Sequence, residues 1–344
     1  MVSTIRNTAT RLAGRCLSRL PGFISSEAGR SVGILMVHGV HAPAIGKRLP
    51  PPSSNVDLDS FTANILTAAR QFRFISMTEA AAMFRGEMPL RPRCLVLTFD
   101  DSLQCLSQLV APRLHAWGIP AIFYISTGAI DRRKSYWWLR LEYATHHLRQ
   151  SPVTLEAAEG GRFVLVPGEQ RHEMARLKAF LRTASQQVCE ALVSEVEDKV
   201  GAALNDSCAE YPYGDIMTWD KARSLSKAGF ELGSHTVTHP NLSRLTPESL
   251  RDELESSRKR IEETTAAACR HCCYPYGAHS EAVCDMARTA GYETAVTTIG
   301  PGFNRQGADL FRLRRFAMPG EAYKLSWLLS RMANDHGSDG GREY

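Results

Sequence analysis

The sequence predicts an α/β fold assembled from parallel βα units. Three observations lead to this prediction. Seven or eight short apolar segments of strand length recur along the 344 residues. Stretches with apolar residues at helical spacing lie between most of them. The strongest strand, 94–99 (CLVLTF), is an almost unbroken apolar run, which is typical of a strand covered on both faces by helices.

The elements follow one another from residue 33, where an apolar strand runs into His38 and Gly39. A loop rich in proline extends from there to Pro52. The other strands are predicted at 72–77, 94–99, 121–125, 230–234, 272–276, 292–298 and 312–317. The helices before the middle of the chain are predicted at 59–71, at 78–86 and in a segment that ends at Leu114.

Residues 131–215 interrupt this alternation. Two strand-like segments, 153–155 and 163–166, flank Gly160-Gly161, which is a hairpin signal. Residues 171–202 then carry apolar side chains at helical spacing, so one long amphipathic helix or two are expected. We therefore expect a domain over 31–333 with a mainly helical insertion at 131–215. Tyr136-Trp137-Trp138 at its start would either face a sugar or anchor the insertion by burial.

The helix at 246–264 is the clearest in the sequence. Thr246 is a suitable N-cap, and Pro247 suits the first turn. Leu250, Leu254 and Ile261 form its buried stripe. We expect its charged remainder, Glu253 included, to be a solvated face.

The chain ends have a different composition. Residues 1–30 carry five arginines and one acid, Glu27, with apolar residues at helical spacing. This segment is expected to be a basic surface helix, and the alternative is peripheral contact with an anionic membrane face. The tail at 334–344 is expected to be disordered. The formal net charge of +5 is spread along the chain, which gives nucleic-acid binding no support.

The cysteine count favours a reducing compartment. There are nine cysteines, an odd number, and no secretory signal pattern is found. We therefore expect free thiols and a cytoplasmic location, with the inner membrane face as the alternative. Cys269, Cys272 and Cys273 resemble half of a zinc site, but no second pair follows, so buried thiols are the preferred interpretation.

Two adjacent carboxylates, Asp100 and Asp101, end the strongest strand. Carboxylates at the end of a buried strand need partners. One aspartate can be explained as the cap of the next helix, but two cannot readily be. In βα architectures the carboxyl ends of strands are where active sites assemble.

A histidine pair, His235 and His239, lies in the segment GSHTVTHPNLS. In an extended strand the two would be roughly 13 Å apart, at about 3.3 Å per residue, which is too far to share one ion. A helical turn would make them neighbours. The β-branched residues between them disfavour an isolated helix, so tertiary or metal bonds would have to hold such a turn.

Two imidazoles and one carboxylate make a three-ligand site with open positions. Such a site suits Zn²⁺ first, with Co²⁺, Ni²⁺ or Fe²⁺ as alternatives. The ion would acidify a water and polarise a carbonyl, and a second carboxylate that is not a ligand would take the proton. Satisfied surface histidines are the default for an isolated pair of this kind.

These motifs carry a family resemblance. TFDDS (98–102), SHTVTHP (234–240) and YPYG (274–277), in this order, resemble the successive motifs of NodB-like polysaccharide deacetylases, carbohydrate esterase family 4. The resemblance covers roughly 31–130 and 216–320. It implies an irregular (β/α) barrel of seven or eight strands. It also implies that Asp100 is the catalytic base and that Asp101, His235 and His239 bind one divalent metal.

The same resemblance covers two further residues. The backbone of Tyr276 would help to bind the oxyanion, and the strand ending in His38 is similar to the LMYH strand of a subgroup, with Val37 in place of tyrosine. His38 is one candidate for the proton donor to the leaving amine, and a metal-bound water is another. The structural alternative for His38 is a strand-end histidine bonded to backbone.

The sequence departs from the family pattern at two places. The third motif often has an arginine that orients the base, and its place falls at Cys273. Many members have a late Leu-x-His whose histidine is the general acid, whereas the corresponding region here is 311–315 (FRLRR). Some members also have a terminal arginine there. The proton donor is therefore unassigned.

The expected function is removal of N-acetyl groups from hexosamines in a polysaccharide, an oligosaccharide or a lipid-linked sugar. The partner is then an N-acetylated carbohydrate. One alternative is a non-catalytic carbohydrate-binding relative, which the two departures suggest. The other is a metal-dependent hydrolase of another amide or ester.

Overall fold

The computed structural model describes residues 31–42, 49–52, 54–149, 151–158, 160–169, 171–205, 208, 210–300 and 302–333. The expectations for the basic segment 1–30 and the tail 334–344 lie outside these residues, so they stay predictions.

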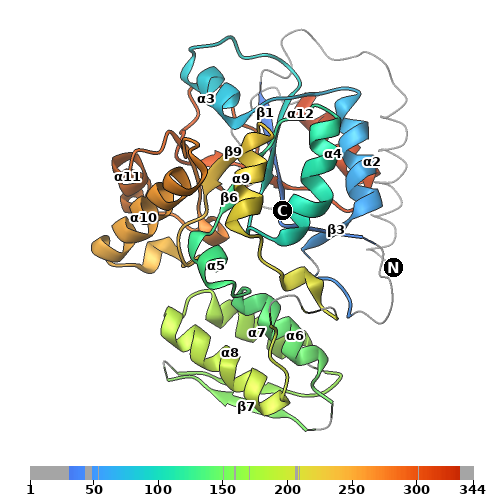
Figure 1. Ribbon diagram of the computed structural model, residues 1–344, viewed down its shortest axis with the longest axis vertical. Helices are drawn as coiled ribbons and strands as arrows, with labels where there is room; N and C mark the ends of the chain where they lie inside the picture. Colours follow the sequence, from blue (N-terminus) through green and yellow to red (C-terminus); the bar gives the residue numbers. More distant parts are fainter. Residues whose placement is uncertain are drawn as a thin grey trace.

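A nearly closed barrel of eight parallel strands forms the centre of the molecule (Figure 1). The strand order is β12-β11-β10-β9-β6-β5-β1-β13, and the short β4 pairs with β5 off this path. This confirms the predicted α/β barrel. The strands are β1 (Val32–Val37), β4 (Arg73–Phe74), β5 (Cys94–Phe99), β6 (Ile122–Ile125), β9 (Glu231–Ser234), β10 (His271–Cys273), β11 (Thr294–Thr297), β12 (Leu313–Arg314) and β13 (Phe316–Ala317).

Register brings the carboxyl ends of the central strands together. Val37 at the end of β1 pairs with Phe99 at the end of β5, and Ile125 of β6 pairs with Ser234 of β9. All six residues of β5 are buried, because helices cover the sheet outside and side chains fill the barrel inside. The residues that follow these strands therefore meet at one mouth of the barrel.

Helices surround the barrel on the outside (Figure 1). The longest, α10, begins after the predicted cap, with the Ser249 amide donating to the Thr246 side chain. Its Leu250, Leu254 and Ile261 are buried, as predicted. The barrel helices are α2 (Leu58–Ala69), α3 (Met77–Arg85), α4 (Ala111–Ala116), α5 (Thr127–Arg132), α9 (Trp219–Lys227), α10 (Pro247–Thr265), α11 (Glu281–Thr289) and α12 (Ala322–Ala333).

Three predicted strands differ clearly from expectation. The strand predicted at 72–77 is reduced to β4, and α3 already begins at Met77. The strand predicted at 272–276 ends at Cys273, because Pro275 has no N–H for a ladder and Tyr276 adopts a left-handed φ of 58°. The strand predicted at 312–317 is split into β12 and β13, with Arg315 between them. Arg315 thus joins the two end strands of the sheet.

The insertion lies below the barrel in Figure 1 and has its own core. A two-stranded antiparallel hairpin packs with three helices through buried side chains such as Leu155, Leu177 and Val193. This part of the chain is mainly helical, in line with the predicted fold class, and the bounds of the insertion at 131–215 stay a prediction. Its elements are α6 (Trp137–His146), β7 (Val153–Glu156), β8 (Arg162–Leu165), α7 (Arg171–Leu181) and α8 (Gln186–Val200).

A small two-stranded parallel sheet stands beside the barrel mouth. It pairs β2 (Gly39–His41) with β3 (Asn55–Asp57), and Gly39 lies opposite Asn55. Because β2 follows β1 after His38, this sheet extends the wall on that side of the mouth.

Two general features concern the described part of the chain. None of its helices combines the length and apolar character needed to cross a membrane. Its cysteines are all free thiols, and Cys269, Cys272 and Cys273 are buried, in line with the preferred interpretation of that cluster.

Candidate metal centre

The barrel mouth brings Asp101, His235 and His239 together. One oxygen of Asp101, Oδ1, lies 3.5 Å from Nε2 of His235 and 3.6 Å from Nε2 of His239. All three residues are buried, and their candidate ligand atoms lie within 4.8 Å of one another. Three donors thus converge on one point, although 134 positions of sequence separate the carboxylate from the first imidazole.

This donor set fits a divalent metal. Two ligands that each bond a tetrahedral ion at about 2.1 Å stand roughly 3.4 Å apart, close to the separations found here. Oδ1 of Asp101 is buried and makes no hydrogen bond within the described residues. A buried carboxylate oxygen is costly without a partner. An ion between Asp101, His235 and His239 would supply that partner.

The loop that carries the histidines is not the helical turn that we expected. Thr236 and His239 both have left-handed φ values, 66° and 60°. The loop is held by its own side chains, since the Thr236 amide donates to Ser234 Oγ and the His239 amide donates to Thr236 Oγ1. The two positive φ values turn the chain back so that the imidazole rings lie 4.6 Å apart, centre to centre.

Glu253 on α10 fixes the same loop, which corrects the expectation of a solvated face. Its carboxylate accepts hydrogen bonds from the amides of Val237 and Thr238, at 2.8 and 2.9 Å, and from Thr238 Oγ1 at 2.6 Å. Three donors at one carboxylate hold the segment between the two histidines in place. This role could not be predicted from the sequence, because it depends on how α10 packs beside β9.

Replacing Glu253 with alanine should weaken metal binding by about 10- to 100-fold, because outer-shell groups that orient ligands contribute on this scale. The affinity can be measured by titration against a competing chelator. Glu255→Ala is a matched control, since Glu255 lies on the same helix and is exposed. Equal metal affinity in the Glu253 variant and the control would contradict the positioning role.

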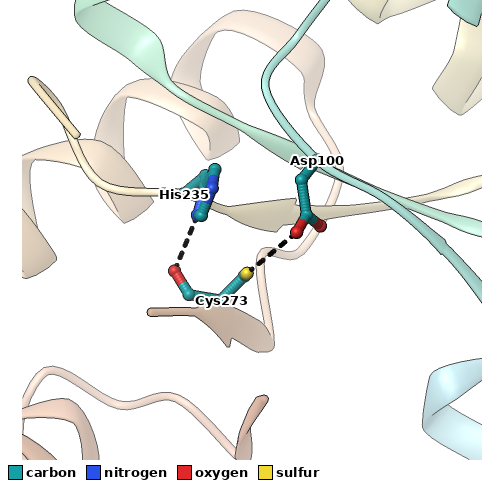
Figure 2. A group of neighbouring side chains, drawn as sticks. All are labelled: Asp100, His235 and Cys273. Atoms are coloured by element: carbon teal, nitrogen blue, oxygen red, sulfur yellow. Dashed lines mark hydrogen bonds between the residues drawn. The ribbon is translucent and has the colours of Figure 1, made fainter. Parts of the chain in front are cut away.

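His235 is oriented by the third motif (Figure 2). Its Nδ1 donates to the carbonyl oxygen of Cys273 at 2.8 Å, which leaves Nε2 free to face Asp101. The thiol of Cys273 donates in turn to Oδ2 of Asp100 at 3.5 Å. Asp100, His235 and Cys273 therefore also form a close group. Arg315 donates to both Asp100 and Cys273, and this positive charge makes the group a poorer candidate for a cation than Asp101, His235 and His239.

Asp100 is paired with Arg315, a residue that the sequence left without a role. Nη1 of Arg315 donates to Oδ1 and Nη2 donates to Oδ2, both at 2.9 Å. Arg315 is 2% exposed and Asp100 is 1% exposed, so the pair is fully withdrawn from water. Nη1 also donates to Thr98 Oγ1, and Nη2 to Cys273 Sγ at 3.1 Å. This two-pronged pairing fixes the plane of the carboxylate.

Arg315 compensates for the first departure from the family pattern, which is Cys273 in the place of an arginine that orients the base. The resemblance places a base-orienting arginine where this chain has Cys273, and in the structure Arg315 reaches Asp100 while contacting Cys273. The FRLRR segment contained the signal, but its sequence does not show which arginine turns inward. The short break between β12 and β13 aims Arg315 into the barrel, whereas Arg314 is exposed.

The environment of Asp100 determines its charge. Burial alone would raise its pKa, but the positive charge and hydrogen bonds of Arg315 outweigh burial and hold that pKa well below its ordinary value. The carboxylate is therefore ionised and can accept a proton. A lowered pKa also weakens a base, so the benefit of the pairing is orientation.

His239 is surrounded by aromatic rings from the insertion and the third motif. Its ring lies 4.9 Å from Trp138, 4.8 Å from Tyr276 and 5.4 Å from Tyr136. Burial lowers its pKa to about 3, so its nitrogens are available as ligands. Tyr136 is buried and donates to the carbonyl oxygen of Asp101, so this residue anchors the insertion.

Trp137 and Trp138 are only partly buried. Nε1 of Trp137 donates to the hydroxyl of Tyr276 at 2.9 Å, and Trp138 stacks on Tyr136 at 4.4 Å. Of the two alternatives for the aromatic run, anchoring by burial is found for Tyr136, and contact with a sugar stays a prediction for the tryptophans. Tyr136 anchors the insertion, and the two tryptophans leave ring surface beside the centre.

His38 lies beside the centre as well. It follows β1, is half-buried, and lies close enough for a positive charge on its ring to lower the pKa of Asp100 and of Asp101. The structure therefore brings His38 and Tyr276 to the centre. Their roles in proton donation and oxyanion binding stay predictions.

Comparison with known proteins gives one family. A family model described as "Polysaccharide deacetylase" matches residues 87–295. A chitooligosaccharide deacetylase from Bradyrhizobium sp. is 32% identical over 89 residues, which are 25% of this chain and 41% of that protein. The YxkH protein of Bacillus subtilis, also named as a polysaccharide deacetylase, is 27% identical over 99 residues, or 29% and 35% of the two chains. The chain thus spans less than half the length of these curated relatives.

Solved structures resemble the whole barrel. The deacetylase PplD from Streptococcus pyogenes has a TM-score of 0.56 at 16% identity, with 87% of this chain and 97% of that chain covered. The BpsB deacetylase domain from Bordetella bronchiseptica has a TM-score of 0.52 at 19% identity, with 86% and 98% covered. At such identities the likeness establishes the fold.

Proposed function

Because the chain belongs to the polysaccharide deacetylase family, we propose that it hydrolyses the N-acetyl group of a hexosamine and releases acetate and a free amine. We propose further that the reaction depends on one divalent metal held by Asp101, His235 and His239. The observation that supports this most strongly is that two carboxylates adjacent in sequence have opposite surroundings. Asp101 faces two imidazoles, and Asp100 faces a buried arginine.

A divalent ion at these three residues would polarise the acetyl carbonyl and increase the acidity of the attacking water. Asp100 lies next to that position and accepts the proton from the water. Arg315 holds both oxygens of Asp100, so the carboxylate keeps one orientation while it gains the proton. The backbone of Tyr276 is the proposed contact for the oxyanion, and its left-handed conformation sets the direction of that peptide.

The half-buried tryptophans support a carbohydrate as the substrate. A pyranose ring has an apolar face that packs well on an indole ring. Trp138 lies against His239, so a sugar stacked there would be next to the ion. The insertion would then contribute to the choice of substrate.

The ion pair of Asp100 with Arg315 argues against the alternative of a non-catalytic carbohydrate-binding relative. That alternative was suggested by the absence of the base-orienting arginine. Arg315 fills that role by position, and a protein that only bound sugars would have no need of an oriented base. This supports an active enzyme.

Removal of the metal is the direct test. Dialysis against a chelator should lower the acetate released from N-acetylated glycans to background, and added Zn²⁺ should restore it, because the proposed reaction needs the ion to increase the acidity of the water and to polarise the carbonyl. Co²⁺, Ni²⁺ and Fe²⁺ should be compared in the same assay. Full activity in protein shown to be free of metal would contradict the proposal. Acetate release from non-sugar amides alone would favour the other class of hydrolase.

A further inference from the structure

Tyr136 links the insertion to the candidate metal centre, and it lies directly before α6. Its hydroxyl donates to the backbone carbonyl oxygen of Asp101 at 2.8 Å. Its ring makes an edge contact with His239, with 5.4 Å between the ring centres. Tyr136 is 7% exposed, so both contacts are shielded from water. One residue of the insertion therefore contacts two of the three candidate ligands.

The backbone of Asp101 adopts a conformation that needs such support. Asp101 has a φ of 73° and Ser102 has a φ of 52°, so two successive residues other than glycine lie in the left-handed region. Such residues stay in this region only where their surroundings hold them there. The carbonyl that Tyr136 binds belongs to the peptide that joins Asp101 to Ser102. The Tyr136 hydroxyl therefore fixes the turn from which the Asp101 carboxylate reaches the histidines.

The same turn is connected to a second candidate ligand. The side-chain oxygen of Ser102 accepts a hydrogen bond from the amide of Ser126 at 2.9 Å. Ser126 Oγ donates in turn to the backbone carbonyl oxygen of His235, also at 2.9 Å. Both serines are buried, so these bonds are protected from exchange with water. A shift of the turn at Asp101 would therefore be transmitted to the strand end that carries His235.

Tyr136 is also firmly joined to the rest of the insertion. Its carbonyl oxygen accepts from the amides of Leu139 and Arg140, at 3.1 and 3.0 Å, where α6 begins. Arg140 is buried and donates to both carboxylate oxygens of Glu197 on α8. The ring of Trp138 stacks on the ring of Tyr136, with 4.4 Å between their centres. The position of Tyr136 is thus tied to both α6 and α8.

We propose that Tyr136 is a positioning residue for the metal ligands, and that through its hydroxyl the binding of the ion and the attachment of the insertion to the barrel strengthen each other. The inference rests on the proposed function only for the presence of an ion at Asp101, His235 and His239. The turn at Asp101 is restrained when its carboxylate is a ligand, and this favours the hydrogen bond from Tyr136. Because such coupling is reciprocal, the attached insertion raises the affinity for the ion by the same factor.

The first test is the metal affinity of Tyr136→Phe, which loses the hydroxyl but keeps the ring contacts with Trp138 and His239. We expect its affinity for Zn²⁺, titrated against a competing chelator, to fall by about 10-fold, the lower end of the range for groups that orient ligands. Saturating Zn²⁺ should still load one ion per chain, because the ligands themselves remain. Tyr143→Phe is the matched control and should bind as the wild type does, since Tyr143 lies farther along α6 and packs on Tyr211.

The second test is hydrogen exchange in the insertion, which does not depend on catalysis. In the wild type, saturating Zn²⁺ should slow the amide exchange of α6 and α8 by about the same 10-fold factor, because the coupling is reciprocal. The helix α2 lies away from the insertion (Figure 1) and is the internal reference. In Tyr136→Phe, the effect of Zn²⁺ on α6 and α8 should fall to the effect on α2. Each comparison is made within one protein with and without metal, so a general loss of stability in the variant cancels.

Equal Zn²⁺ affinity in the wild type and in Tyr136→Phe would overturn this inference and leave the proposed metal centre intact. An equal loss of affinity in Tyr143→Phe would also overturn it, and so would equal protection of α2 and α8 by the ion, because either result would show a general effect. A wild type that binds no divalent ion would overturn the proposed centre and the coupling together. If Tyr136→Phe does not fold, exchange in the wild type decides, and α6 and α8 without protection by Zn²⁺ would overturn the coupling.

Discussion

Replacing Asp100 with asparagine should lower the rate of acetate release by about 10²- to 10⁴-fold, the range for loss of a general base, while metal binding is retained. The reason is that Asp100 is not among the three converging donors, so its carboxylate acts on the proton and not on the ion. Asparagine keeps the size of the side chain and one acceptor oxygen for Arg315, but it cannot take a proton from water near neutral pH.

The measurement is a steady-state assay of acetate release together with the metal content of the purified variant. Asp101→Asn is the informative comparison, since it should lose both metal and activity. Thermal unfolding of the Asp100 variant shows whether the barrel is intact. Normal turnover by Asp100→Asn would show that the base is another group.

Replacing Arg315 with methionine is expected to have the second largest effect. The change leaves the buried Asp100 carboxylate without its charged partner, which should lower the free energy of unfolding by about 3–5 kcal/mol. Turnover should fall by about 10²-fold or more, because a reacting group displaced by about 1 Å costs that much. Arg315→Lys keeps the charge but has one nitrogen in place of two, so it cannot form the two parallel hydrogen bonds, and an intermediate loss is expected.

The matched control is Arg314→Met, one position earlier, where the side chain is exposed. That variant should have nearly unchanged stability and turnover. A double-mutant cycle separates positioning from general damage. In an Asp100→Asn background, Arg315→Met should lower the residual turnover little further, because both changes act on one interaction. Fully additive losses would argue against Arg315 acting through Asp100.

The buried ion pair connects the barrel interior with the proposed proton transfer. The pair of Arg315 and Asp100 lies in the barrel interior, where a single charge would be costly. Two parallel hydrogen bonds between them, and the hydrogen bonds of Arg315 to Thr98 and Cys273, offset this cost. The same interior that excludes water therefore holds the proposed base in one orientation.

The sequence by itself determined the alternation of strands and helices, the burial of β5 on both faces, and the position of polar residues after strand ends. These features are local, because the period of apolar residues and the residues at caps depend on near neighbours in the chain. Asp100, Asp101, His235 and His239 could be selected for the same reason. Each belongs to a short motif that needs no knowledge of distant contacts.

Tertiary structure alone decided which side chains support these motifs. Glu253 was expected to face solvent, and the packing of α10 beside β9 instead brings it to the histidine loop. Arg315 is 215 positions from Asp100 in sequence, and a break of one residue between β12 and β13 aims it at the base. Such partners cannot be read from the order of residues, because their contacts depend on the register and closure of the barrel.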